Sequence, residues 1–356
     1  MKTIDFYSSG PEGSPSDRKN NFDFIRFIAA SAVIFSHSYP LTFGSNEKEP
    51  LSILSNGVCN IGDTAVGIFF IISGFLVTQS FERSRSLKHY FLARSLRIFP
   101  ALIAVVLLLT FIAGPILTHI SIRQYFSSPV TWQYLERMVI FTNEDNVALP
   151  GVFENTPYAR IVDGSLWTLS YELVCYLLLP AIVLLVKRNW FPALSLLTLA
   201  VLLSVPFLYL VLFMKLGSCF LFGSLYYVFR KNIPMDGRLA LAAFAMVLLS
   251  LRTGLFFYVF GLAGGYLILF LAFIPHTSRL RFSKYGDFSY GIYIWAFPVQ
   301  QVIAEQYASK GNFFNAAISF PVALLFGILS WHFIEKKALA LKSKIVGTKY
   351  KSVPIY

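Results

Sequence analysis

Apolar runs of about 20 residues, each long enough to cross a lipid bilayer, recur along this chain from Phe22 to Ile334. Only 13% of the residues are charged, about half the share that solvates the surface of a soluble domain. The pattern therefore predicts an all-α, polytopic transmembrane helical bundle. We predict about ten spans, at residues 22–41, 58–80, 98–119, 165–186, 190–209, 211–229, 238–253, 255–274, 288–306 and 314–334.

The net charge of +12 is distributed unevenly between the two sides of the predicted bundle. With the N-terminus inside, about three-quarters of the 30 Lys and Arg residues fall on the inner side, as the positive-inside rule requires. An even number of spans then places both termini in the cytoplasm. Because the basic residues cluster between apolar runs, they indicate topology and contact with membrane lipid, and we expect no nucleic-acid partner.

The chain divides into three parts by composition. Residues 1–20 are polar and contain Pro, Gly and Ser, which predicts a disordered cytoplasmic lead. A transmembrane domain is expected over residues 21–337, and a basic cytoplasmic tail over residues 338–356. The longest connection, residues 120–164 on the outer side, is rich in aromatic residues and is expected to be ordered. The cysteines lack metal-ligand spacing, so we expect neither a disulfide framework nor a metal site.

Two ionisable residues in the first span share one helical face. Arg26 and His37 are separated by about three helical turns, or about 16 Å along the axis. Arg26 then lies near the cytoplasmic face, where Asp23 can pair with it, and His37 lies toward the outer half. Ionisable groups at this depth usually serve a function. The alternative is that Arg26 snorkels to the interface and His37 is a satisfied interfacial histidine.

A carboxylate is predicted inside the fourth span. Glu172 lies about two turns into it, with Ser165, Thr168 and Ser170 as expected hydrogen-bond partners. A buried carboxylate near a histidine can orient it and stabilise its charged form. The alternative is a structural hydrogen bond between helices.

The predicted inner loop from Phe81 to Arg97 is rich in cations, among them Arg83, Arg94 and Arg97. Guanidinium groups bind phosphate in a bidentate manner, so this loop suits a polyanionic ligand. The alternative is that the loop is basic for topology alone. Ser73 and Gly74, in the span before the loop, are small residues that permit close helix approach, so we expect them to serve helix packing. Together, the ionisable residues describe an acid–base site below the outer surface with a cationic mouth on the inner side. A transferase with a phosphate-bearing cytoplasmic donor and an outer acceptor needs this arrangement.

At this point the sequence resembles a known family, the bacterial inner-membrane acyltransferase family 3, which O-acetylates surface polysaccharides and related glycans. The resemblance extends from Asn21 to about Lys337. The similar segments are Arg-x10-His (Arg26 to His37), Phe-Phe-x-x-Ser-Gly-Phe-Leu (Phe69 to Leu76), Arg-x-x-Arg-Ile-x-Pro (Arg94 to Pro100), Ser-Leu-Trp-Thr-Leu-x-x-Glu (Ser165 to Glu172), Gly286 to Trp295 and Ser330 to Lys336.

The resemblance implies an acetyl-CoA-dependent O-acetyltransferase in the bacterial inner membrane. Its acceptor would be an O-antigen, an exopolysaccharide or a similar glycan, including a lipid-linked one. His37 would be the catalytic base or the carrier of the acetyl group, and Glu172 would support His37 or the acceptor. Arg26, Arg83, Arg94 and Arg97 would bind the donor. The outer residues 120–164 would then recognise the acceptor.

The chain departs from the family pattern at two places. Many members have an acidic residue where this chain has Gly67, and Asp63 one helical turn earlier is a candidate substitute. Some have a histidine in the late signature where this chain reads Trp295-Ala296-Phe297-Pro298. Two other classes remain open: a transporter or flippase for an anionic or lipid-linked substrate, which predicts two repeated halves, and a non-catalytic membrane scaffold. We find no such repeat, and a scaffold leaves the shared face of Arg26 and His37 unexplained.

Overall fold

The computed structural model describes residues 3–4, 20–84, 86–140, 148–187, 207–273 and 286–346 of the 356-residue chain. Within these ranges the regular structure is helical, and the one β-bridge, between Thr3 and Pro234, belongs to no strand. The predicted all-α fold class is therefore confirmed.

Six helical stretches in the described part are long and apolar enough to cross a membrane. They are Phe22–Phe43, Ile61–Glu82, Leu87–Leu117, Val211–Val228, Phe256–Phe273 and Asn312–Leu341. Two further helices, α9 (Trp167–Lys187) and α15 (Ser289–Tyr307), coincide with the fourth and ninth predicted spans. Most of the fifth predicted span, 190–209, lies outside the described residues, so the total of ten and the cytoplasmic termini remain predictions.

Helix α4 (Ile61–Glu82) packs between α2 (Phe22–Phe43) and α11 (Phe207–Val228). Glycines bring the backbones of α4 and α11 together. A Cβ on Gly74 would lie 2.0 Å from the Phe220 carbonyl oxygen, and one on Gly223 would lie 2.1 Å from that of Ile71. Any side chain at Gly74 or Gly223 would clash with the backbone of the other helix. Small residues at such positions let membrane helices approach closely. Gly74 therefore has the packing role that the Ser-Gly pair predicted.

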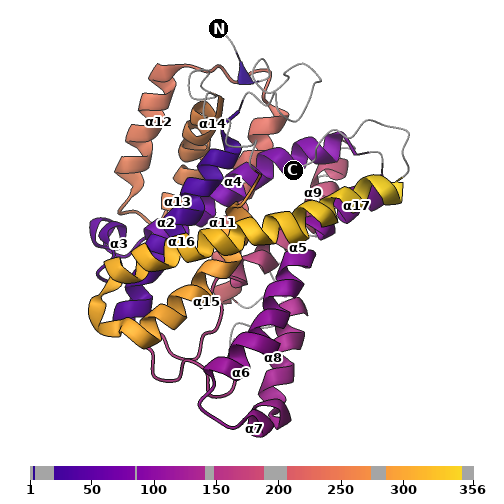
Figure 1. Ribbon diagram of the computed structural model, residues 1–356. Helices are drawn as coiled ribbons and strands as arrows, with labels where there is room; N and C mark the ends of the chain where they lie inside the picture. Colours follow the sequence, from indigo (N-terminus) through magenta and orange to yellow (C-terminus); the bar gives the residue numbers. More distant parts are fainter. Residues whose placement is uncertain are drawn as a thin grey trace.

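The last helices form a continuous rod across the molecule. Helix α16 (Asn312–Ser330) passes through a π-helical turn, η8 (Trp331–Glu335), into α17 (Lys336–Val346). This rod, yellow in Figure 1, packs on α2 and α15 and then passes over α5 (Leu87–Leu108). The rod thereby brings the end of η8 to the side of α5.

The second half of the predicted inner loop is helical, so that part of the prediction is wrong. Helix α5 begins at Leu87, where Ser86 caps it by accepting a hydrogen bond from the His89 backbone N–H at 3.2 Å. A serine at this position satisfies an otherwise unbonded N–H group, so helix formation starts 11 residues before the apolar run that defined the predicted span. As a result, Arg94 and Arg97 lie on a helix in the bundle and not at its edge.

The segment 120–164, predicted to lie on the outer side, is ordered where it is described, as its aromatic content predicted. It forms α7 (Ile122–Ser127) and α8 (Pro129–Ile140), and α8 packs back along α5. The buried Tyr125 hydroxyl donates to the Thr110 carbonyl at 2.8 Å, which ties α7 to the C-terminal end of the α5 column, at the bottom of Figure 1. The remaining described helices are α3 (Pro50–Leu54), η2 (Leu109–Ala113), α6 (Gly114–Leu117), α12 (Gly237–Ser250), α13 (Phe256–Val259), η4 (Phe260–Gly264), α14 (Gly265–Phe273) and η7 (Ala308–Lys310).

Candidate active site

Arg26 is held by two carboxylates in the interior of the bundle. Its Nη2 lies 3.3 Å from Asp23 Oδ1, one turn earlier on α2, so the predicted pairing is confirmed. Its Nη1 lies 2.5 Å from Asp287 Oδ2, just before α15. Only tertiary packing creates this second contact, because the two residues are 261 positions apart.

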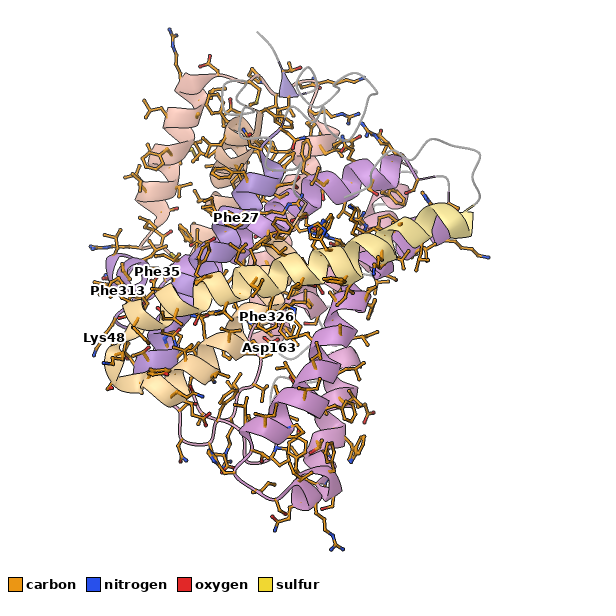
Figure 2. The ribbon with its side chains drawn as sticks, viewed as in Figure 1. Phe27, Phe35, Lys48, Asp163, Phe313 and Phe326 are labelled. Atoms are coloured by element: carbon orange, nitrogen blue, oxygen red, sulfur yellow. The ribbon has the colours of Figure 1, made fainter. Side chains whose placement is uncertain are left out.

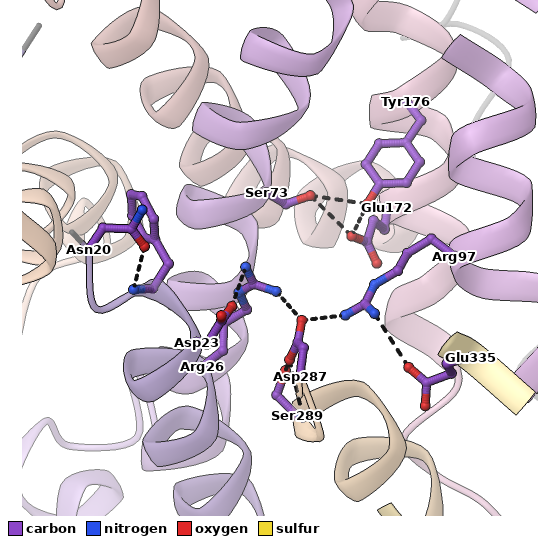
Figure 3. A network of polar contacts seen from close by, with 11 residues as sticks. Asn20, Asp23, Arg26, Ser73, Arg97, Glu172, Tyr176, Asp287, Ser289 and Glu335 are labelled. Atoms are coloured by element: carbon purple, nitrogen blue, oxygen red, sulfur yellow. Dashed lines mark hydrogen bonds and ion pairs between the residues drawn. The ribbon is translucent and has the colours of Figure 1, made fainter. Parts of the chain in front are cut away.

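Asp287 also binds Arg97, and so it joins three helices. Arg97 Nη2, on α5, lies 2.6 Å from the same Asp287 Oδ2. Arg97 Nη1 lies 3.4 Å from Glu335 Oε2 at the end of η8. Figure 3 shows the resulting chain of contacts. We call Asp23, Arg26, Arg97, Asp287 and Glu335 the arginine–carboxylate network.

Most of the network's buried charged atoms are paired within it or bonded by neighbouring serines, and Arg26 Nε is the one atom of its guanidinium without a partner among the described residues. Asp287 and Glu335 are each 1% exposed. Ser289 Oγ donates to Asp287 Oδ1 at 2.5 Å, and Ser330 Oγ donates to Glu335 Oε1 at 2.9 Å. Charges removed from water are tolerated only when they are paired and hydrogen-bonded in this way. The network therefore fixes the relative positions of α2, α5, α15 and η8.

Glu172 belongs to a second polar cluster, on the α9 side. Ser73 Oγ on α4 donates to Glu172 Oε1 at 3.1 Å, and the Tyr176 hydroxyl donates to the same oxygen. Tyr176 is positioned in turn by Tyr90 of α5, whose hydroxyl donates to the Tyr176 carbonyl at 2.9 Å. Ser73, which the sequence assigned to packing, thus contributes its hydroxyl to this cluster.

The predicted hydrogen-bond partners of Glu172 are wrong. The Thr168 hydroxyl bonds instead with the Tyr293 hydroxyl at 2.7 Å. Ser170 Oγ donates to the Trp167 carbonyl of its own helix at 2.7 Å, and Ser165 Oγ has no partner among the described residues. The predicted partners lie within seven residues of Glu172 on the chain, but the actual donor on α4 comes from helix packing.

The two clusters line one cavity of about 100 Å³. Four of the six predicted site residues line it: Arg26, Arg94, Arg97 and Glu172. The Arg94 guanidinium lies 5.8 Å from the Tyr176 ring centre, and that of Arg97 lies 5.7 Å from the Tyr290 ring centre. These residues lie on three separate helices, α2, α5 and α9, and converge on one internal space.

His37 lies beyond this cavity and does not line it. It is half-buried on α2, and its ring centre is 5.3 Å from that of Phe297 on α15. Its Nδ1 is buried without a hydrogen-bond partner in the described part of the chain. Because Tyr293 lines the cavity and Phe297 follows one turn later, His37 lies about one helical turn past the cavity along α15.

The end of the segment 120–164 packs on α15 at Phe297, the residue whose ring contacts His37. Gln301 Nε2 donates to the carbonyls of Tyr158 and Ile161, at 2.8 Å each, and so holds this segment on α15. A Cβ on Gly164 would lie 2.6 Å from the Phe297 ring, and the Tyr158 ring centre is 6.3 Å from that of Phe297. The backbone at Arg160 is left-handed, with φ of 65°, a strained conformation for a residue with a side chain. The segment is therefore held tightly against the helix that contacts His37.

Asp163, at the end of this segment, is 1% exposed and lies in the interior (Figure 2). Its Oδ1 accepts from the Ser165 backbone N–H at 3.0 Å, whereas its Oδ2 has no partner among the described residues. Burial raises the pKa of Asp163 well above its ordinary value. Burial also raises the pKa of Tyr134 on α8, with a further contribution from Asp163. Burial thus favours the protonated, uncharged form of Asp163.

Arg83 lies apart from the cavity. It is exposed at the end of α4, beside Glu82, which pairs with Arg230 at 3.3 Å. The candidate substitute for the family's acidic residue is also elsewhere. Asp63 accepts a hydrogen bond from Asn60 Nδ2 at 2.8 Å and does not line the cavity. Gly67 is required for packing, because a Cβ there would lie 3.0 Å from the Phe260 ring.

Sequence reasoning missed three residues of the site. Asp287 and Glu335 lie within the two motifs quoted at the C-terminal end, but those motifs were used for resemblance and not for chemistry. Tyr176 lies one turn after Glu172, a spacing that predicts contact on a helix. In each case the sequence signal for a site residue was an acidic or phenolic group within a quoted motif or one turn after it.

Among the described residues, no group of three or more His, Cys, Asp or Glu side chains could hold a metal ion. The three cysteines are buried and form no disulfide.

Comparison with known proteins places this geometry in context. Residues 19–333 match the family described as an acyltransferase domain. An O-acetyl transferase of Shigella phage Sf6 is 31% identical over 352 residues, which cover 92% of this chain and 98% of that protein. Nodulation protein 10 of Rhizobium leguminosarum bv. viciae is 38% identical over 188 residues, covering 51% of this chain and 48% of that protein. No solved structure matches.

The family match covers the cavity, Glu172, His37 and every residue of the arginine–carboxylate network except Glu335, which lies two residues past its end. The membrane-spanning helices are those of a multi-pass membrane protein. The chain belongs to the acyltransferase family that its motifs indicated.

Proposed function

We propose that the protein transfers an acetyl group from acetyl-CoA to a hydroxyl of a cell-surface glycan, at the outer side of the bacterial inner membrane. The observation that carries the proposal is the convergence of Arg26, Arg94, Arg97 and Glu172 on one cavity inside a membrane bundle of the acyltransferase family. The name of the phage relative, an O-acetyl transferase, supports acetyl as the transferred group.

In this proposal the donor enters from the cytoplasmic side, where the positive-inside rule places the start of α5. Arg94 and Arg97 then lie on its path, and Arg26 lies on the opposite wall of the cavity. Arg83, exposed on the connection before α5, is available to the donor's phosphates before they reach the interior. Phosphate at Arg26 or Arg97 has to compete with Asp287, which already binds both.

His37 acts on the acceptor side. A neutral imidazole accepts the proton of the sugar hydroxyl as the hydroxyl oxygen attacks the thioester carbonyl. The new C–O bond forms, the C–S bond breaks, and coenzyme A leaves as a thiolate that takes up the proton. For this step the acceptor and the thioester must meet near the turn of α15 between Tyr293 and Phe297, which separates the cavity from His37.

The segment held on α15 by Gln301 is the proposed acceptor platform. Tyr158 and Arg160 are exposed on it, and the Tyr158 ring contacts Phe297, which in turn contacts His37. An aromatic ring and a guanidinium group are suited to contact with sugar rings and hydroxyls. The acceptor is then a polysaccharide or lipid-linked glycan that approaches from the outer side.

The test uses the full chain in lipid nanodiscs with acetyl-labelled acetyl-CoA and a crude surface-polysaccharide extract. Coenzyme A release and label on the glycan are followed for wild type and for His37→Ala. We expect both signals with wild type and neither with the variant. Folded wild-type protein that releases no coenzyme A and labels no acceptor in a broad panel would overturn the proposal. Equal labelling by both proteins would retain the enzyme and remove His37 from its chemistry.

A further inference from the structure

The cavity has two chemically different walls. One face of α4 supplies apolar side chains: Val66, Phe69, Phe70, Ile72, Leu76 and Val77. The opposite wall is polar and contains Arg94, Arg97, Glu172 and Tyr176. A ligand that fits both walls has a short apolar end and a polar group next to it.

The size of the cavity restricts the ligand further. A volume of about 100 Å³ corresponds to roughly three water molecules, and a cavity of about 150 Å³ accepts a benzene ring. A nucleotide or a phosphate with its hydration shell does not fit in this space. The acyl end of a thioester does, because its carbonyl is polar and its carbon tail is apolar.

The arginine–carboxylate network excludes the anionic end of the donor from the same space. Arg26 and Arg97 are already neutralised by Asp23, Asp287 and Glu335. An uncharged thioester carbonyl needs only a hydrogen bond from such a group and displaces no ion pair. The phosphates of the donor lie at its opposite end, so they remain outside this cavity when the acyl end is inside.

We infer that this cavity is the acyl-binding pocket of the donor site, and that Ile72 on α4 sets the longest acyl chain it accepts. This inference rests on the proposed acyl transfer. The carbonyl faces the polar wall and the tail runs against α4, where Ile72 and Leu76, one turn apart, line the apolar side. One extra methylene in a closed apolar pocket changes specificity by about 10- to 200-fold. The pocket therefore favours acetyl over longer acyl groups.

The chain offers a matched control for this inference. Ile71 and Ile72 are neighbours on α4 and are 0% and 1% exposed. Ile72 lines the cavity. The Ile71 side chain points elsewhere, since its Cγ2 lies 3.6 Å from the position of a Cβ on Gly265, in α14. Truncation of either residue removes the same atoms from an equally buried site, but only one truncation enlarges the cavity.

The experiment measures transfer to glycan from acetyl-, propionyl-, butyryl- and hexanoyl-CoA, with wild type, Ile72→Ala and Ile71→Ala in nanodiscs. We expect wild type to use butyryl-CoA at least about tenfold more slowly than acetyl-CoA. Ile72→Ala should reduce that preference by about tenfold or more, and Ile71→Ala should retain it. Ile72→Val, a smaller change, should shift the preference partly and serves if Ile72→Ala does not fold.

The possible outcomes separate the acyl-binding pocket, the role of Ile72 and the proposed function from one another. Equal use of acetyl- and hexanoyl-CoA by wild type would overturn the pocket. An unchanged chain-length preference in folded Ile72→Ala or Ile72→Val would overturn the role of Ile72. In both cases acetyl transfer by wild type would still support the proposed function. Absence of transfer from every donor by folded wild-type protein would instead overturn the proposed function itself.

Discussion

The polar groups around Asp287 and those around His37 are buried in the same bundle, but the fold treats them differently. Around Asp287, Arg26 and Arg97 are paired with carboxylates at 2.5–3.4 Å. Around His37, its own Nδ1, Asp163 Oδ2 and Ser165 Oγ have no partner among the described residues. An unsatisfied buried polar atom costs about 1–3 kcal/mol. The first region, in which Arg26 Nε alone of these guanidinium atoms is buried without a partner among the described residues, therefore stabilises the fold. We propose that in the second region the acceptor supplies the missing partners.

The largest expected effect is on the rate, at His37. We expect His37→Ala to lower kcat about 10²- to 10⁴-fold, because a positioned general base contributes that much. The midpoint of thermal unfolding should stay near the wild-type value, since His37 Nδ1 bonds no described residue. The measurement pairs label transfer with thermal unfolding in detergent. A large loss of stability with little loss of rate would reverse the proposed contrast between the two regions.

Asp287→Asn should mainly lower the stability of the fold, in contrast to His37→Ala, which should mainly lower the rate. Removal of the charge that Arg26 and Arg97 share leaves buried guanidinium groups undercompensated, and we expect a loss of about 3–5 kcal/mol in the free energy of unfolding. Chemical denaturation in detergent measures it. Glu335→Gln is the control, and its loss should be smaller because Arg97 keeps Asp287. Equal stability of Asp287→Asn and wild type would show that the network does not hold the helices together.

Removal of the Ser73 hydroxyl tests how much one hydrogen-bond donor contributes to the polar wall of the cavity. Ser73→Ala removes one donor from Glu172, whereas Tyr176 remains, so we expect a loss of about 1 kcal/mol and a several-fold lower rate. Thr78→Val is the matched control on the same helix, because the Thr78 hydroxyl bonds only the Gly74 carbonyl, at 2.7 Å. Equal rates for the two variants would remove the Ser73–Glu172 contact from the chemistry.

The last expected effect is at Asp163, and it is the one that depends on pH. Burial raises the pKa of Asp163, so the folded protein keeps a proton that the unfolded chain loses above about pH 4. Its contribution to stability therefore falls as pH rises from about 4 toward the folded-state pKa. Asp163→Asn removes this dependence.

Thermal unfolding between pH 5 and pH 8 measures the effect. The difference in stability between Asp163→Asn and wild type should move in favour of the variant as pH rises. Glu154→Gln, at an exposed position of the same segment, is the control and should show no such trend. A difference that does not change with pH would show that Asp163 is ionised in the folded protein.

Parts of the site were readable from the sequence and parts were not. Arg26, Arg94, Arg97 and Glu172 could be selected because an ionisable residue in or beside an apolar run is unusual wherever the run folds. Their partners could not be selected in the same way. Ser73 was assigned to packing, and Thr168 was expected to bond Glu172 but bonds Tyr293.

The extent of α5 shows the same limit for the fold. Hydropathy placed the third span at 98–119, whereas the helix begins at Leu87, capped by Ser86. A cap and amphipathic packing extend a helix beyond its apolar run, and hydropathy does not register either. This extension places Arg94 and Arg97 in the interior, where the cavity and the arginine–carboxylate network form.

The sequence by itself determined that this chain is a helical membrane protein of the acyltransferase family, and it identified most of the charged residues that line the cavity. Span length and motif order are properties of the local sequence, so they can be recognised without knowledge of the tertiary structure. Only the tertiary structure decided that Asp287 and Glu335, 190 and 238 residues from Arg97, neutralise it, and that His37 lies beyond the cavity. The physical reason is that a buried charge selects its partner by distance in space, and that distance is set by which helices pack together.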